Sequence, residues 1–107
     1  MGASKEYRDY ILERLGTVTA VYSRAMFGGF GIYADDAMFG LISSDDVFYL
    51  KVDDSTRPDY EKEEMPQFHS MPYFRLPVEV LEDDEELKQW MTQSVEIGIR
   101  TKKKKKK

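Results

Sequence analysis

The sequence predicts an α+β domain in which one antiparallel sheet of mixed strand lengths packs with helices. Two observations favour this class. A helical apolar period appears near both ends of the chain, while the middle alternates β-branched and aromatic runs with turn residues. The 107 residues are 41% hydrophobic and 13% aromatic, which is enough for one domain with a buried core. The expected element order is α-β-β-β-α-β-β-α.

The first half predicts one helix and three strands. Ser4 supplies an N-cap for a helix over residues 4–15. A β-rich stretch from residue 18 to 33 follows, with a bulge or sharp bend expected at Gly28–Gly29. Turn residues then separate two further strands, over residues 38–42 and 47–52, which makes an antiparallel meander.

The second half predicts a short helix, two short strands and a long helix. The short helix covers residues 56–63, and prolines bracket extended pieces near 67–70 and 73–76. Asp83 or Asp84 caps the long helix, whose apolar stripe is formed by Leu87, Trp90, Met91 and Val95. The domain is expected to span residues 1–101.

Charge is distributed unevenly along the chain. The net charge is −4, but six lysines form the end of the sequence, and the rest carries 10 basic against 20 acidic residues, a net of −10. Dispersed basic residues in an acidic body do not predict a DNA-binding face. The terminal segment is expected to be a disordered tail, native or a tag, able to contact phosphate without sequence preference. It consists of Lys102, Lys103, Lys104, Lys105, Lys106 and Lys107.

Composition excludes several classes of chemistry. The absence of cysteine excludes disulfides, thiolate metal sites and cysteine nucleophiles. The glycine run lacks a dinucleotide-binding or P-loop pattern, and the paired aspartates fall in turns and caps. His69 is the single histidine, so a small hydrolase using it or paired carboxylates remains only a third hypothesis. We therefore expect no catalytic residue, metal or cofactor, and a cytoplasmic location.

Five segments in this order resemble the N-terminal domain of the bacterial TfoX (Sxy) family. They are RAMFGGFGIY, FGLI, DDVFYLKVDD, MPYFRLP and LEDDEELKQWMTQSVEIG, and together they span nearly the whole chain before the lysines. The resemblance implies a secretion-chaperone-like α+β fold and a regulator of natural competence. It also implies action with the cyclic-AMP receptor protein at promoters. Full regulators carry a second domain, which is expected to begin about where this sequence ends, so the chain is either a stand-alone domain or a truncated one.

The leading hypothesis is a non-enzymatic interaction module in transcriptional regulation, with DNA contact indirect or through the tail. The alternative is a homodimeric adaptor or chaperone-like module that pairs through the MFGGFGIY strand or the third helix. Aromatic residues and methionine are enriched at protein interfaces. The candidate interaction residues are Arg24, Phe27, Phe30, Tyr33, Tyr73 and Arg75.

Overall fold

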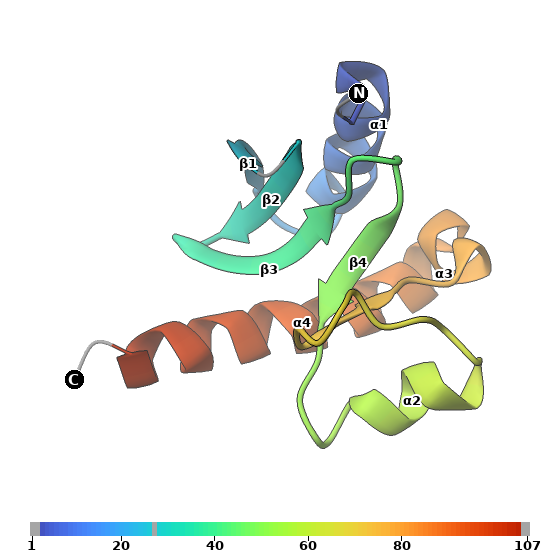
Figure 1. The fold of residues 1–107 in the computed structure, drawn as a ribbon, viewed down its shortest axis with the longest axis vertical. Helices are drawn as coiled ribbons and strands as arrows, with labels where there is room; N and C mark the ends of the chain where they lie inside the picture. Colours follow the sequence, from blue (N-terminus) through green and yellow to red (C-terminus); the bar gives the residue numbers. More distant parts are fainter. Residues whose placement is uncertain (1–2, 27, 106–107) are drawn as a thin grey trace.

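The chain folds around one five-stranded antiparallel sheet whose strands lie side by side in sequence order (Figure 1). The computed structural model describes residues 3–26 and 28–105. The α+β class, the antiparallel sheet and the general order of segments, with a helix at each end and the strands between them, confirm the sequence prediction. The elements are α1 (Lys5–Gly16), β1 (Tyr22–Met26), β2 (Gly29–Ala34), β3 (Ala37–Ile42), β4 (Phe48–Lys51), α2 (Arg57–Lys62), β5 (Tyr73–Arg75), α3 (Val78–Glu82) and α4 (Asp84–Lys105).

The stretch over residues 18–33, predicted as one bent strand, forms two strands. β1 ends at Met26, and Gly28 has a φ of +79°, a left-handed conformation that glycine adopts without a steric penalty. β2 then runs back along β1, with Met26 opposite Gly29. The predicted bulge is therefore wrong at this point, because the chain reverses direction.

The next turn confirms the sequence prediction. Asp35 and Asp36 have φ values of 51° and 62°, the left-handed pair typical of a tight hairpin turn. The bulge in this sheet lies just before it, where the β2–β3 register shifts between Ile32 and Tyr33. Such a shift bends a sheet and increases its twist.

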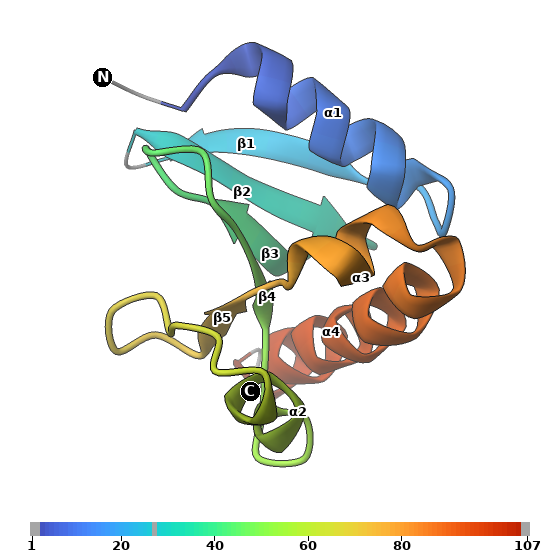
Figure 2. The same ribbon diagram turned by 90° about the vertical axis from the view of Figure 1, so that its right-hand side faces the viewer.

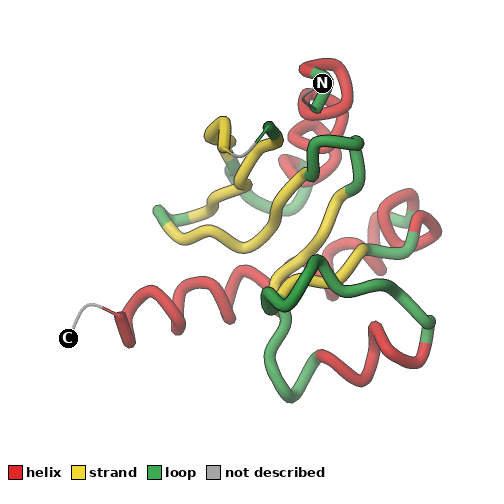
Figure 3. The backbone as a smooth tube through the Cα atoms, in the orientation of Figure 1, coloured by secondary structure: helices red, strands yellow, loops and turns green. Residues whose placement is uncertain are grey.

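Residues 67–70, predicted as a strand, run as part of a loop with a single bridge to β5 (Figure 3). The Phe68 N–H donates to the Tyr73 carbonyl at 2.8 Å, and the Arg75 N–H donates to the Pro66 carbonyl at 3.0 Å. The segment therefore covers the outer edge of β5 without forming a strand of its own.

Helices α1, α3 and α4 cover one face of the sheet (Figure 2). Residues from these helices and from that face form a single buried cluster, which α2 joins through Tyr60. The Tyr60 ring meets the Trp90 ring edge-on, with their centroids 4.8 Å apart. The cluster includes Ile11, Leu15, Ile32, Phe39, Ile42, Leu50, Tyr60, Phe74, Leu87 and Met91.

The predicted helix caps are present. The Ser4 hydroxyl accepts a hydrogen bond from the Tyr7 N–H at 3.0 Å, and Asp83 Oδ1 accepts from the N–H groups of Glu85 and Glu86. These bonds satisfy donors that a helix leaves free in its first turn.

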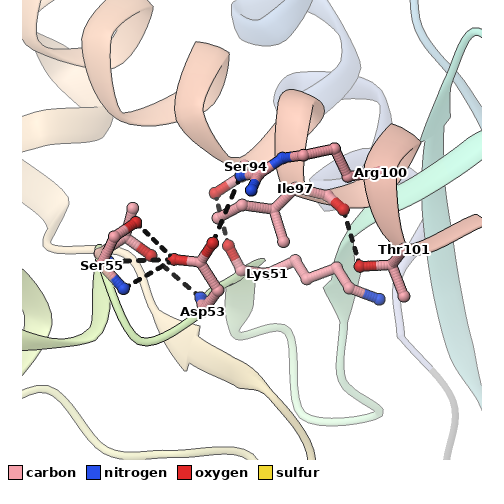
Figure 4. A network of polar contacts seen from close by, with 8 residues as sticks. Lys51, Asp53, Ser55, Ser94, Ile97, Arg100 and Thr101 are labelled. Atoms are coloured by element: carbon pink, nitrogen blue, oxygen red, sulfur yellow. Dashed lines mark hydrogen bonds and ion pairs between the residues drawn. The ribbon is translucent and has the colours of Figure 1, made fainter. Parts of the chain in front are cut away.

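Helix α4 is fixed against the end of β4 (Figure 4). The buried Ser94 hydroxyl donates to the Lys51 carbonyl at 2.8 Å, and Arg100 forms an ion pair with Asp53 at 3.3 Å. The helix continues through Lys105, so the expectation of a disordered tail from residue 102 is wrong for residues 102–105.

Candidate interaction surface

The face of the sheet opposite α1, α3 and α4 carries the candidate site, and we call it the open face. Its central row crosses all five strands. Arg24 lies opposite Gly31, Gly31 opposite Leu41, Leu41 opposite Tyr49, and Tyr49 opposite Arg75. Side chains directly opposite one another in an antiparallel sheet point to the same side. The row therefore begins and ends with an arginine.

Every charged residue within the strands is a cation on the open face. Arg24 and Arg75 belong to the central row, and Lys51 follows Tyr49 by two positions on β4. The five strands contain no aspartate or glutamate, so all 20 acidic residues lie in helices, loops and turns. The strands thus contribute only positive charge to the open face of an acidic protein, while Asp45 from the β3–β4 turn also lines the cavity on this face.

A cavity of about 740 Å³ opens on this face between the sheet and the loop that precedes β5. This volume falls within the range of small-molecule and side-chain pockets. Its lining is mostly apolar, with polar groups near the β3–β4 turn. The apolar residues include Met26, Met38, Leu41, Tyr49, Phe68 and Met71, and the polar ones are Ser43, Ser44, Asp45 and His69.

Because Gly29 and Gly31 of β2 have no side chain, neighbouring groups pack directly on the β2 backbone beneath the cavity. A Cβ on Gly31 would stand 2.7 Å from the Met26 methyl group, and a Cβ on Gly29 would collide with the Ile42 carbonyl. The space above Gly31 is therefore used by Met26 and by the Tyr33 ring. These glycines have a packing role, because they allow neighbouring groups to approach the β2 backbone closely.

Aromatic rings and cations pair along the open face. The Tyr22 and Tyr33 rings stack with centroids 5.3 Å apart, and the Arg24 guanidinium lies 5.5 Å from the Tyr33 centroid. Lys51 Nζ lies 5.4 Å from the Tyr73 centroid. Burial, with a smaller contribution from the Tyr33 phenol, raises the pKa of Tyr73 to about 12.

Polar chemistry at the cavity mouth is limited to a few groups. The Ser43 hydroxyl donates a short hydrogen bond to Asp45, and this bond is the main cause that lowers the pKa of that carboxyl. His69 has a φ of 53°, and its ring meets the edge of the Phe68 ring, with centroids 4.4 Å apart. Within residues 3–26 and 28–105, no three histidine or acidic side chains gather as a metal site would require.

The structure brings four of the six predicted interaction residues to the open face: Arg24, Tyr33, Tyr73 and Arg75. Tyr73 is only 3% exposed, so its side chain lies beneath the surface of the open face and contributes little accessible area. Phe30 also borders the cavity, but it lies opposite Ile42, packs against the core and has the Arg8 guanidinium 5.1 Å from its ring. Phe27 lies outside the described residues.

The six C-terminal lysines differ in their structural surroundings. Lys102 Nζ donates to the Asp36 carbonyl at 2.6 Å, and Lys103 is exposed. Lys104 and Lys105 belong to α4, while Lys106 and Lys107 lie outside the described residues. Lys102 and Lys103 do not line the cavity.

The six predicted interaction residues do not include most of the cavity wall, such as Leu41, Tyr49, Phe68 and Met71. Strand alternation places Tyr49 and Lys51 on one face. No local signal, however, indicates that the loop of Phe68 and Met71 stands over Leu41.

Fold and site together define a small α+β domain with a single sheet, helices on one face and a hollowed face with positively charged strand residues on the other. The model of the TfoX N-terminal domain matches residues 13–97, so the chain belongs to this family. It is a family of non-catalytic domains, and membership supports a regulatory or interaction module in general. A search of curated proteins gives no significant match. None of the helices in the described part of the chain has the length and apolarity needed to cross a bilayer.

Proposed function

We propose that this chain is a non-enzymatic regulatory module of the cytoplasm that binds a protein partner through the open face. Its proposed process is coactivation of competence-type genes, and the cyclic-AMP receptor protein is the proposed partner. Membership in the TfoX N-terminal domain family supports the regulatory class. The cavity on the open face is the observation that carries the binding role.

The composition of this face supports a protein as the partner. Methionine, tyrosine, phenylalanine and arginine are enriched at protein interfaces, and all four occur on the open face. Met71 is 42% exposed, a large apolar side chain at the cavity wall that a partner would cover. Flexible methionine side chains adapt to the shape of an incoming group.

DNA contact is proposed to be indirect or through the C-terminal lysines. The chain without residues 102–107 has a net charge of −10, which opposes close approach to a phosphate backbone. Any tail-mediated contact would weaken steeply with added salt.

Fluorescence anisotropy of labelled promoter DNA tests the proposal. The chain, with and without residues 102–107, is titrated onto bare DNA and onto DNA saturated with cyclic-AMP receptor protein. We expect a further rise only on the preloaded DNA, unchanged by loss of the lysines. Strong binding to bare duplex DNA without residues 102–107 would overturn the proposal.

A pair of matched variants locates the contact. Met71→Asp places a charge at the cavity wall, and Val78→Asp places the same charge on α3, where Val78 is 51% exposed. Met71→Asp is expected to weaken binding to the preloaded DNA about tenfold, by the loss of a partly buried apolar contact. Val78→Asp is expected to leave it unchanged. Equal effects of the two variants would remove the open face from the proposal.

A second copy of the chain is the alternative partner, and the outer edge of β1 favours it. The outer edge of β5 is covered by the segment around Pro66 and Phe68, but no hydrogen bond from another described segment reaches the outer edge of β1. An uncovered edge strand can pair with another chain. Sedimentation at micromolar concentration tests this alternative, and a strictly monomeric result would exclude it.

A further inference from the structure

We propose that the open face binds an extended partner segment that has an apolar centre and an acidic residue at each end. This inference rests on the proposed function and names the chemistry of the bound segment. It follows from the charges of the strands, the length of the central row and the cavity between its ends.

Charge complementarity with the open face favours a partner segment that has an acidic residue at each end. Arg24 and Arg75 close the central row, both are exposed, and neither forms an ion pair with another described residue. Arg24 stacks on Tyr33, an arrangement that leaves the N–H edge of a guanidinium available to a carboxylate. The strands carry no acidic residue, so the like charges nearest to the row come from turns: Asp36, which accepts a hydrogen bond from Tyr22, and Asp45 at the cavity.

The spacing of the arginines sets the length of the segment. Adjacent strands lie about 4.8 Å apart, so the four spacings between Arg24 on β1 and Arg75 on β5 measure about 19 Å along the sheet. An extended peptide rises about 3.3 Å per residue and covers this distance with about six residues. A single carboxylate, such as that of a fatty acid, cannot engage both arginines at this separation.

The apolar lining of the cavity favours a partner segment whose central residues are apolar. Leu41 and Tyr49 lie between the two arginines in the row, and both line the cavity together with Met26 and Phe68. Asp45 stands at the cavity mouth as a carboxylate whose hydrogen bond from Ser43 favours the ionised form. An acidic residue at the centre would meet this charge and no arginine of the row. An acidic residue beside Arg75 would meet both the Asp45 charge and the guanidinium, which lies close enough to contribute to the lowered pKa of Asp45.

The same features disfavour a nucleic acid as the occupant. A phosphate backbone places a charge at every nucleotide, so some phosphates would face the apolar cavity and Asp45. The acidic residues outside the strands also repel a long polyanion more than a short segment with two charges.

Binding of a labelled peptide of about seven residues, with aspartate at both ends and leucine and phenylalanine in the centre, tests the inference. Its matched probes have lysine at both ends or aspartate at one end only. We expect the peptide with two aspartates to bind most tightly, and Arg24→Glu and Arg75→Glu each to weaken it about fivefold, the upper range for an exposed ion pair. Lys88→Glu on α4 makes the same charge change at an exposed position and is expected to leave binding unchanged.

The double variant Arg24→Glu/Arg75→Glu is expected to reverse the preference and to bind the peptide with two lysines. Circular dichroism of each variant verifies the fold. Three results would overturn the inference: equal binding of all three peptides, equal loss with Lys88→Glu, or tighter binding of a labelled oligonucleotide that competes with the peptide. If the peptide fails but the promoter assay still depends on Met71, the inference falls and the proposed function stands.

Discussion

Gly98 of α4 lies directly against Met38 of β3. A Cβ added to the glycine would stand 2.7 Å from the Met38 carbonyl oxygen and 3.4 Å from the Phe39 Cβ. The helix therefore reaches the sheet with no side chain between the two backbones, and its distance from β3 depends on this glycine.

Gly98→Ala is expected to destabilise the protein by about 1–3 kcal/mol, because the helix must move away from backbone that cannot yield. Alanine has a higher helix propensity than glycine, so without the close contact the substitution would stabilise the protein. Gly16→Ala is the control, since a Cβ there meets no atom within 4 Å. Urea unfolding measures both, and a stabilised Gly98→Ala would contradict the observed packing.

Ser94→Ala is expected to cost about 1–3 kcal/mol. Ser94 is 1% exposed, and its hydroxyl donates to the Lys51 carbonyl, which the substitution leaves without this donor. Thr92→Ala, on the exposed side of the same helix, is expected to change stability little. Thermal unfolding of the two variants in parallel provides the measurement, and a loss no larger than that of Thr92→Ala would count against the bond.

Arg14→Met is expected to lower the free energy of unfolding by about 1–3 kcal/mol. The Arg14 guanidinium donates to the Leu81 carbonyl through both Nε and an Nη, at 3.0 and 2.9 Å, and so ties α1 to α3. It also forms an ion pair with Asp84, which is 79% exposed. Asp84→Asn is therefore expected to have an effect below about 1 kcal/mol. Equal losses in the two variants would assign the stabilisation to the ion pair.

Stability is expected to fall in alkaline solution, partly through Tyr73. A tyrosine in the unfolded chain titrates near pH 10, and burial raises the pKa of Tyr73 to about 12 in the folded protein. Above about pH 10 the unfolded chain loses this proton first, so stability that is complete below pH 10 is lost as the pH rises toward 12. Urea unfolding over this range should give a shallower decline for Tyr73→Phe, by up to about one proton. Identical slopes would show that Tyr73 does not contribute.

Local chemistry predicted the elements well. Ser4 and Asp83 cap helices as expected, and the aspartates at 35 and 36 form the expected turn. The sequence does not predict the reversal at Gly28, because a glycine permits a bend, a bulge or a turn. The choice among these depends on which strands pair.

The candidate site was less predictable, because it depends on register. Arg24 and Arg75 lie on the two outermost strands, and only the pairing of five strands places them in one row. Phe30 and Arg24 belong to the same sequence segment, RAMFGGFGIY. Strand alternation nevertheless places Phe30 on the face of the sheet opposite to that of Arg24. The loop that carries Phe68 and Met71 has no periodic pattern, so its position over the sheet could not be inferred.

The strands carry three cations, Arg24, Lys51 and Arg75, and no acidic residue, so the sheet itself attracts anionic groups although the protein has a net negative charge. An acidic segment that approaches the open face is attracted to these cations before it makes apolar contacts with the cavity. Ionic strength should then act mainly on the association rate constant, while the dissociation rate constant depends on the apolar contacts formed afterwards.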